Sequence, residues 1–148
     1  MLDGSTTAFA LVPQLAAFKN LIVLTSSAKT SLALGGAGIK NICTGGSMIN
    51  RSFSYVGSDA LRTIRSYNAD LCFFSCRGIT QSGYACDNSA EENEIRIAMC
   101  EQSQKRILLC DSSKFGVSCL QNLRHISAFD AVLSDAPLPK DYISPEKP

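Results

Sequence analysis

The chain has 148 residues, of which 45% are hydrophobic and 18% are charged. This length and balance fit one folded domain with a buried core and exclude an intrinsically disordered chain. Fourteen Lys and Arg residues against thirteen Asp and Glu residues give a formal net charge of +1, which excludes a basic surface for binding nucleic acid. No apolar run approaches the roughly 20 residues that cross a bilayer, and no signal-peptide pattern opens the chain, so we expect a cytoplasmic protein without a membrane partner.

The seven cysteines indicate reduced thiols rather than a disulfide framework or a zinc site. Their number is odd, no CxxC pair occurs, and His125 is the one histidine available to bind a metal. Cys43, Cys72 and Cys110 lie in apolar, strand-like runs, where a free cysteine behaves as a small buried hydrophobe. We therefore expect inert thiols in a reducing compartment and no metal ion.

Helical patterns and short apolar runs alternate along the chain. In order, the sequence predicts helix Thr6–Phe18, strand Leu21–Thr25, strand Ile39–Thr44, helix Ser58–Tyr67, strand Asp70–Ser75, helix Ser89–Ser103, strand Arg106–Asp111 and strand Ala131–Asp135. The apolar runs are nearly continuous, which is typical of parallel strands covered on both faces. This order predicts an α/β fold with three layers, Rossmann-like, around a mostly parallel sheet.

The start of the predicted helix Ser89–Ser103 carries a dense acidic cluster. Ser89 and Glu92 form a capping-box pattern, in which each side chain accepts the other residue's free backbone amide. Asp87, Glu91 and Glu94 lie close by, where the positive end of the helix dipole favours negative charge. We interpret the cluster as a helix start and not as a metal site.

Both ends of the chain carry distinct patterns. Met1-Leu2 leads directly into what resembles a strand-to-helix turn, whereas strands usually have about five residues. We therefore expect that the natural chain continues upstream. At the other end, Pro137–Pro148 contains four prolines and predicts an extended or frayed tail, which leaves residues 1–136 as the domain.

The segment Asp3-Gly4-Ser5-Thr6-Thr7 is the most informative in the sequence. Gly4 permits a tight turn, and three hydroxyl side chains follow beside the free amides of a beginning helix. This combination suits an anion, particularly a phosphate, although an ordinary Ser/Thr helix cap explains the same residues. The segment is neither a Walker loop nor a GxGxxG fingerprint, so no nucleotide cofactor is expected.

Further polar residues follow the other predicted strands. Because parallel sheets bind ligands at the carboxyl ends of their strands, these residues are candidates for one polar crevice. Arg77 could pair with a phosphate or a carboxylate, or could be an ordinary surface residue, and Lys114 could supply a point charge. The candidate ligand-binding residues after the first segment are Thr25, Ser26, Gly45, Gly46, Arg77, Gly78, Asp111 and Lys114.

The order of these motifs resembles the C-terminal effector-sensing domain of DeoR-type bacterial transcription regulators. The resemblance covers about residues 1 to 135. Its two most specific pieces are Asp3-Gly4-Ser5-Thr6-Thr7 and Asp111-Ser112-Ser113-Lys114-Phe115-Gly116. The other pieces are Val23–Ser27, Cys43–Gly46, Val56–Leu61, Asp70–Gly78 and Phe129–Asp135.

The resemblance implies a fold similar to ribose-5-phosphate isomerase and glucosamine-6-phosphate deaminase. It also implies that the domain binds a phosphorylated sugar effector and forms a homodimer or higher homo-oligomer. In this family an N-terminal winged helix-turn-helix, absent from this chain, binds operator DNA. By the same resemblance, the Gly4–Thr7 loop with Thr25 and Ser26 would hold phosphate and sugar hydroxyls, and Gly45, Arg77 and Lys114 would complete the pocket.

Three function classes remain open on the sequence. Sugar-phosphate isomerisation needs a base beside the reacting carbon, and the segment Ser75–Gly83, at the end of the predicted strand Asp70–Ser75, contains no carboxylate. Cys76 has no nearby base to activate it, and His125 is isolated. The sequence therefore favours a sensor that binds without chemistry over an isomerase or deaminase-like enzyme. A dimerisation module that has lost its ligand is the third class.

Overall fold

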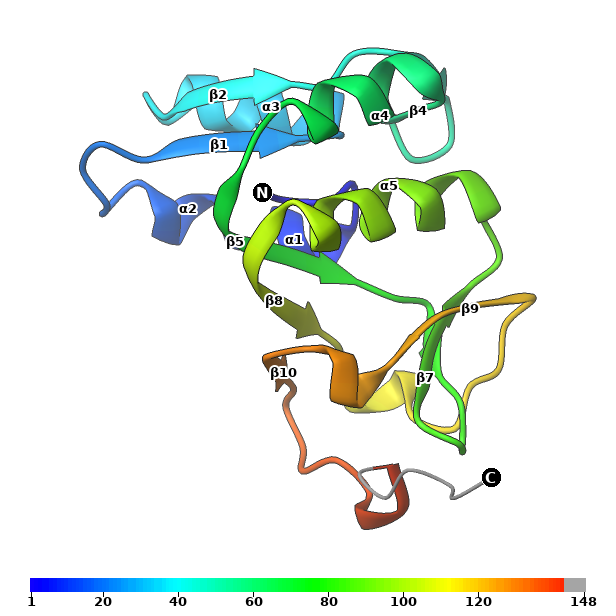
Figure 1. The fold of residues 1–148 in the computed structure, drawn as a ribbon. Helices are drawn as coiled ribbons and strands as arrows, with labels where there is room; N and C mark the ends of the chain where they lie inside the picture. Colours follow the sequence, from blue (N-terminus) through cyan, green and yellow to red (C-terminus); the bar gives the residue numbers. More distant parts are fainter. Residues whose placement is uncertain (143–148) are drawn as a thin grey trace.

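Five parallel strands form the central sheet of the computed structural model, which describes residues 1–142. All five overlap the predicted strands and confirm the α/β fold class. They are β1 (Ile22–Thr25), β2 (Lys40–Cys43), β5 (Ala69–Ser75), β8 (Ser103–Leu109) and β10 (Ala131–Leu133). Strand β2 pairs with β1, whereas β5 and β10 pair with opposite edges of β8 (Figure 1).

Residues Met1 and Leu2 join the two halves of this sheet. Leu2 forms parallel bridges with Thr25 on one side and with Phe73 on the other. Its amide donates to Leu24 O at 2.9 Å, and the Phe73 amide donates to Met1 O at 2.9 Å. The segment therefore lies between β1 and β5, and the following loop emerges at the middle of the carboxyl edge. From this segment the strand order runs outward to β1 and β2 on one side and to β5 and β8 on the other. In open α/β sheets, ligands bind where the strand order reverses in this way.

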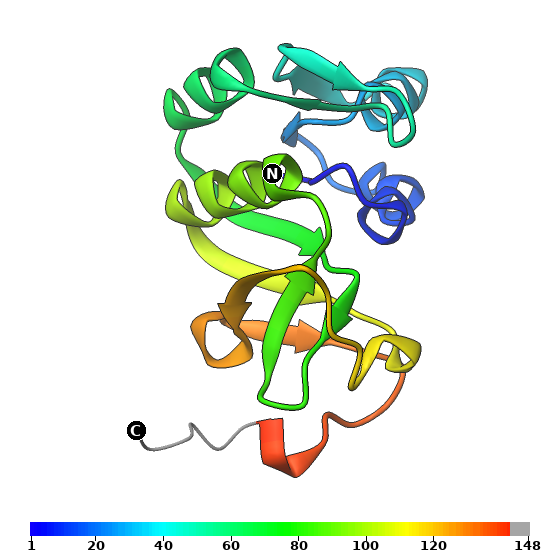
Figure 2. The same ribbon diagram turned by 90° about the vertical axis from the view of Figure 1, so that its right-hand side faces the viewer.

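Helices cover both faces of the sheet (Figure 2). The helices α1 (Thr6–Phe9), α2 (Val12–Leu15) and α3 (Ala28–Gly36) lie on one face, and α4 (Ser58–Arg65) and α5 (Ala90–Glu101) lie on the other. Successive strand residues point to opposite faces: Phe73 packs with the α1–α3 cluster and Phe74 with the α4–α5 cluster. Both faces of the central strands are thus apolar, which explains the continuous hydrophobic runs.

The single helix predicted over Thr6–Phe18 is wrong. Helix α1 ends at Phe9, and α2 begins at Val12 with Pro13 in its first turn. Proline lacks an amide hydrogen and its ring clashes with the carbonyl four residues earlier, so a helix cannot run from Phe9 through Pro13 undisturbed. The predicted strand Arg106–Asp111 also needs correction, because β8 begins at Ser103 and ends at Leu109.

Two antiparallel units were not predicted. One is the hairpin of β3 (Ser47–Ile49) and β4 (Ser54–Val56), and the other is a small sheet of β6 (Gly78–Ile79), β7 (Tyr84–Asp87) and β9 (Gln121–His125). The hairpin is tied to the carboxyl end of β1, since the Ala28 amide donates to Phe53 O and the Tyr55 amide to Ser26 O. The hairpin loop therefore reaches the edge of the sheet where the candidate site lies.

The tail differs from the predicted extension over its described part. Residues Lys140–Tyr142 form a 3₁₀ turn, and Tyr142 is buried. The Tyr142 ring meets Phe115 edge to face, with 6.2 Å between the ring centroids. Residues 143–148 lie outside the described range. Within residues 1–142, no helix combines the length and apolar character that crossing a bilayer requires.

The start of α5 only half fulfils the capping-box prediction. Ser89 Oγ accepts from the Glu92 amide at 3.3 Å. The Ser89 amide donates instead to Asp87 Oδ1 at 3.3 Å, because Asp87 lies two residues before the cap with its carboxylate turned back toward it. The acidic cluster is thus a helix start, as predicted, with Asp87 in the place that the pattern assigned to Glu92.

Removing the Ser89 cap should destabilise the fold modestly. We expect Ser89→Ala to lower the free energy of unfolding by about 1 kcal/mol, because the Glu92 amide loses its acceptor. Urea denaturation measures the change. The control is Ser118→Ala, an exposed position, which should leave stability within about 0.5 kcal/mol of the parent. Equal losses in the two variants would contradict the assigned cap.

Candidate functional site

A polar crevice of about 700 Å³ lies at the carboxyl edge of the sheet. This volume falls in the range of small-molecule sites, roughly 300 to 1,000 Å³. Its walls come from seven segments: α1 with the loop before it, the start of α3, the β3–β4 loop, the tip of β5, the end of β7, the first two turns of α5 and the turn after β8. Residues far apart in the sequence therefore face one volume.

The loop Gly4–Thr7 contributes one wall of this crevice. Ser5 is committed to the protein: its Oγ donates to Asp3 Oδ1 at 2.6 Å and accepts from the Ala8 amide at 3.1 Å. The amides of Gly4, Thr6 and Thr7 have no hydrogen-bond acceptor among residues 1–142. The loop thus presents backbone donors and two threonine hydroxyls to the crevice.

Besides the buried Arg96, four cationic side chains border the same volume. Lys114 Nζ donates to Ser75 Oγ at 3.0 Å and lies 3.6 Å from Asp111 Oδ2. Arg77 Nε is 3.7 Å from Asp87 Oδ1, with its side chain 61% exposed. Lys29, whose Nζ lies 4.6 Å from the centre of the Phe9 ring, and Arg51 complete the set. This arrangement gives the crevice donors and positive charge suited to an anion.

Thr30 adds a hydroxyl without a partner. The residue is only 1% exposed and lines the crevice from the first turn of α3. Its Oγ1 makes no hydrogen bond within the described part of the chain. A buried hydroxyl without a partner is costly, so this oxygen is a polar group that the described fold leaves unsatisfied.

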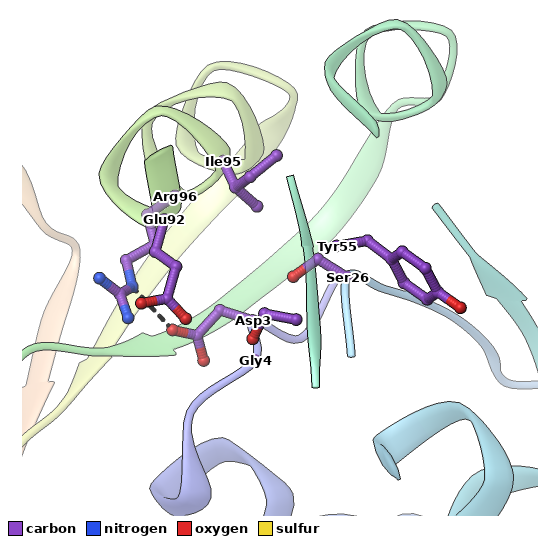
Figure 3. A pocket seen from close by; sticks show the side chains of 8 residues that line it. Asp3, Gly4, Ser26, Tyr55, Glu92, Ile95 and Arg96 are labelled. Carbon is purple, nitrogen blue, oxygen red and sulfur yellow. Dashed lines mark hydrogen bonds and ion pairs between the residues drawn. The ribbon is translucent and has the colours of Figure 1, made fainter. Parts of the chain in front are cut away.

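Beneath the loop, Arg96 of α5 is buried between two carboxylates. Its Nε donates to Asp3 Oδ2 at 2.9 Å, and its Nη1 donates to Asp87 Oδ2 at 3.0 Å and to Asn93 Oδ1 at 3.2 Å. Figure 3 shows Arg96, from α5, meeting Asp3 beside Gly4. Burial opposes the guanidinium charge, but Asp3 and Asp87 outweigh it, so the pKa of Arg96 is raised and the side chain stays charged.

The Asp3 carboxylate is occupied by the protein itself. Besides Arg96, it accepts from the Ser75 amide at 3.3 Å and from the Ser5 amide and hydroxyl. It is 1% exposed. Asp3 therefore fixes the Gly4–Thr7 loop to α5 and to the tip of β5, and it faces a cavity of about 10 Å³, roughly the space of one water molecule.

Gly4 fits this place because no side chain would. A Cβ there would overlap Ser54 Oγ, and Ser54 is buried in the β3–β4 hairpin. The absence of a side chain at Gly4 thus lets the hairpin pack directly against the loop.

The predicted site residues fall into three groups. Those that line the crevice are Gly4, Ser5, Thr6, Thr7, Arg77 and Lys114. Asp3 and Ser26 line the small cavity beneath it. The third group lines neither volume and consists of Thr25, Gly45, Gly46, Gly78 and Asp111.

Four of the five residues that line neither volume make a hydrogen bond or a close contact nearby. Thr25 Oγ1 accepts from the Ser27 amide at 3.2 Å, and Asp111 Oδ1 accepts from the Ser113 amide at 3.1 Å. A Cβ on Gly46 would lie 2.6 Å from Val56 O, so this glycine permits close packing against the hairpin. Gly78 packs in the same way against Val117.

Sequence reasoning missed Lys29, Thr30, Arg51 and the carboxylates in the crevice. Segment Ser75–Gly83 indeed contains no carboxylate, but Asp87 and Glu92 reach the crevice from β7 and α5. Asp87 is bound by Arg96 and by the Asn88 and Ser89 amides. A signal for Arg96 was present, since Met99 and Cys100, three and four positions later, place this arginine on an apolar face of the helix.

The described side chains do not form a metal centre. Across residues 1–142, no three His, Cys, Asp or Glu side chains gather closely enough to hold an ion. The polar groups that line the crevice are backbone amides, hydroxyls, cationic side chains and the carboxylates of Asp87 and Glu92.

The fold and the crevice define an α/β domain of the ribose-5-phosphate isomerase type. Ribose 5-phosphate isomerase A from Methanocaldococcus jannaschii aligns with a TM-score of 0.52 and 12% identity, over 78% of this chain and 46% of that chain. The eIF2B delta structure from Chaetomium thermophilum aligns with a TM-score of 0.64 and 17% identity, over 93% of this chain and 49% of that one. These likenesses establish the fold alone.

The family model described as the DeoR C terminal sensor domain matches residues 1–136, and the chain belongs to this family. The HTH-type transcriptional regulator GolR of Listeria innocua is 32% identical over 136 residues, 91% of this chain and 54% of the relative. The L-fucose operon activator of Escherichia coli K12 is 30% identical, covering 90% of this chain and 55% of the relative. The glycerol-3-phosphate regulon repressor of the same organism is 29% identical, covering 93% and 55%. The chain spans about half the length of these relatives.

Removing the charge of Arg96 should destabilise the protein strongly. We expect Arg96→Met to lower the free energy of unfolding by about 3–5 kcal/mol, because Asp3 and Asp87 would remain buried without their counter-charge. The control is Arg62→Met, which breaks the exposed Arg62–Asp59 pair and should change stability by less than about 1 kcal/mol. Chemical denaturation monitored by circular dichroism distinguishes the two, and similar losses would rule out a central role for Arg96.

Proposed function

We propose that this chain is the ligand-sensing domain of a transcription regulator. A phosphorylated sugar or a related anionic metabolite binds in the crevice, and binding controls how a DNA-binding part outside this chain engages its operator. The observation that carries this proposal is the convergence of Lys114 and the unpaired amides of Gly4, Thr6 and Thr7 on one crevice.

A phosphate group suits this convergence. Phosphate oxygens accept several hydrogen bonds at once, and charged donors strengthen those bonds. Lys114 supplies the charge from a half-buried position, and the loop amides supply fixed donors. The Thr30 hydroxyl suits a sugar hydroxyl, and the Phe9 and Phe53 rings provide apolar walls. The crevice can thus recognise both ends of a sugar phosphate.

The names of two relatives support the same class of ligand. One carries the name of an L-fucose operon activator and another that of a glycerol-3-phosphate regulon repressor. A regulator of either kind must respond to a small polar metabolite. Assembly into a homodimer or higher homo-oligomer, which the family resemblance implies, stays a prediction.

Control of DNA binding follows from a population shift. A metabolite that binds one arrangement of the regulator more tightly increases the fraction in that arrangement. A coupling of about 1–3 kcal/mol between the two sites would change operator affinity roughly 5- to 150-fold.

Binding without chemistry is the account that we favour, but one carboxylate supports an enzyme as the alternative. Asp87 is held by Arg96 and by the α5 cap, so it is poorly placed to take a proton from a substrate. Glu92 lines the crevice, and its carboxylate has no hydrogen bond or ion pair within residues 1–142. It is the residue that could act as a base in an isomerase or deaminase-like reaction.

Ligand binding should depend on Lys114. With a sugar phosphate at about a hundred times its Kd, we expect the parent chain to gain roughly 2.7 kcal/mol, which raises Tm by on the order of 5–10 °C. Lys114→Ala should reduce this rise to less than about half, because a charged hydrogen bond contributes roughly 1.5–3 kcal/mol. Differential scanning fluorimetry with a panel of sugar phosphates measures the effect.

The matched control is Lys105→Ala, an exposed lysine on β8 away from its carboxyl end. It should keep the full rise in Tm. If the two lysine variants respond alike, Lys114 is not part of the site. If no sugar phosphate on the panel raises the Tm of the parent, the domain is a module without such a ligand.

Turnover decides between sensor and enzyme. We expect the bound sugar phosphates to be recovered unchanged after prolonged incubation, with no exchange of their carbon-bound hydrogens for solvent deuterium in NMR spectra. Glu92→Gln should bind the same ligands within a few-fold, since it keeps the shape of the side chain. Isomerisation or exchange that the parent shows and Glu92→Gln lacks would establish the enzyme instead.

A further inference from the structure

Two cysteines face each other at the crevice, where Cys76 lines the wall and Cys110 lies behind it. Cys76 follows Ser75 at the end of β5, and Cys110 follows Leu109 at the end of β8, and these two preceding residues are paired in register. The Cys76 and Cys110 sulfurs are 3.9 Å apart. Neighbouring strands lie about 4.8 Å apart, within the roughly 4.4–6.8 Å that separates Cα atoms in disulfides. A bond between these sulfurs therefore requires only a small local movement.

Contact with the crevice distinguishes this pair, although Cys43 and Cys119 are the more exposed cysteines. Cys76 lines the crevice, and Cys110 is buried directly behind it. Cys72 lies beside Cys100 in the core under α5, and Cys86 lies beside Cys119 with its thiol directed at the Gly78 and Val117 carbonyls. Neither of these pairs lines the crevice. A small molecule in the crevice thus reaches the Cys76–Cys110 pair first.

The two thiols have complementary protonation. Donation from Cys76, together with the positive charge of Lys114, outweighs burial and lowers the pKa of Cys110. The hydrogen bond to Cys110, burial and the charge of Cys110 raise the pKa of Cys76. Cys110 can thus accept the proton of Cys76, which leaves the Cys76 sulfur, on the wall of the crevice, free to react.

We propose that Cys76 and Cys110 form a reversible modification site, in which a peroxide that enters the crevice converts the two thiols into a disulfide. The proposal does not depend on the identity of the metabolite or on its binding. It departs from the expectation that the cysteines are inert.

The reaction balances in two steps. Cys110 takes the proton of Cys76, the Cys76 sulfur attacks one oxygen of hydrogen peroxide, the O–O bond breaks, and the departing hydroxide takes a proton from solvent and leaves as water. Cys110 then loses its proton and attacks the sulfenic sulfur of Cys76, the S–O bond breaks, and the hydroxide takes up that proton and leaves as a second water. Two thiols and one peroxide give one disulfide and two waters, and a dithiol reductant reverses the change.

Peptide mapping tests the proposal directly. The folded chain is treated with increasing hydrogen peroxide, its remaining thiols are blocked under denaturing conditions, and trypsin is added. Cleavage after lysine and arginine places Cys76 in peptide 66–77 and Cys110 in peptide 107–114. We expect these two peptides to be the first joined, with the loss of two hydrogens, and to separate after reduction. Fragmentation identifies Cys76 rather than Cys72 as the linked residue of peptide 66–77.

Other linkages would overturn the proposal. First linkage of peptide 66–77 to 97–105 would show that Cys72 and Cys100 react first, and linkage of 78–96 to 115–124 would assign the reaction to Cys86 and Cys119. Absence of any linkage, with the protein still folded by circular dichroism, would equally refute it. Cys76→Ala should abolish the expected linkage, whereas Cys43→Ala, which removes the remaining cysteine, should retain it.

Discussion

The buried ion pairs of Arg96 are the interaction on which the candidate site depends. A guanidinium out of contact with water must be matched by acceptors, and here Asp3 and Asp87 supply them. These carboxylates come from the amino end of the chain and from β7, and Arg96 comes from α5. The pairs therefore fix three distant segments in one arrangement, and the Gly4–Thr7 loop takes its place at the sheet edge from that arrangement.

This network separates two kinds of charge. Asp3, Asp87 and Arg96 neutralise one another beneath the loop and are engaged by the protein. Lys29, Arg51, Arg77 and Lys114 border the crevice, where they are more exposed and better able to meet a ligand. The residue that heads the most specific sequence motif, Asp3, thus holds the site together, while the glycine and the threonines after it face the crevice.

The sequence predicts the parallel sheet well because buried strands are marked by local apolar runs, as at Ile22–Thr25 and Ala69–Ser75. It fails at α1 and α2, where Pro13 interrupts an apolar pattern that otherwise fits one helix. The short antiparallel strands carry no such runs, so the β3–β4 hairpin was missed, and Arg51 and Phe53 with it. Arg96 and the Cys76–Cys110 pair were missed for a different reason: their partners are set by the pairing of segments far apart in the chain, which spacing does not encode.

The Met1–Leu2 segment has a mechanical consequence. It is the one strand-like connection, within the described chain, between the β1–β2 half of the sheet and the half that contains β5, β8 and β10. The crevice above it takes Lys29 and Thr30 from the first half and Lys114 from the second. A molecule bound there would contact both halves at once and would stiffen the sheet between them.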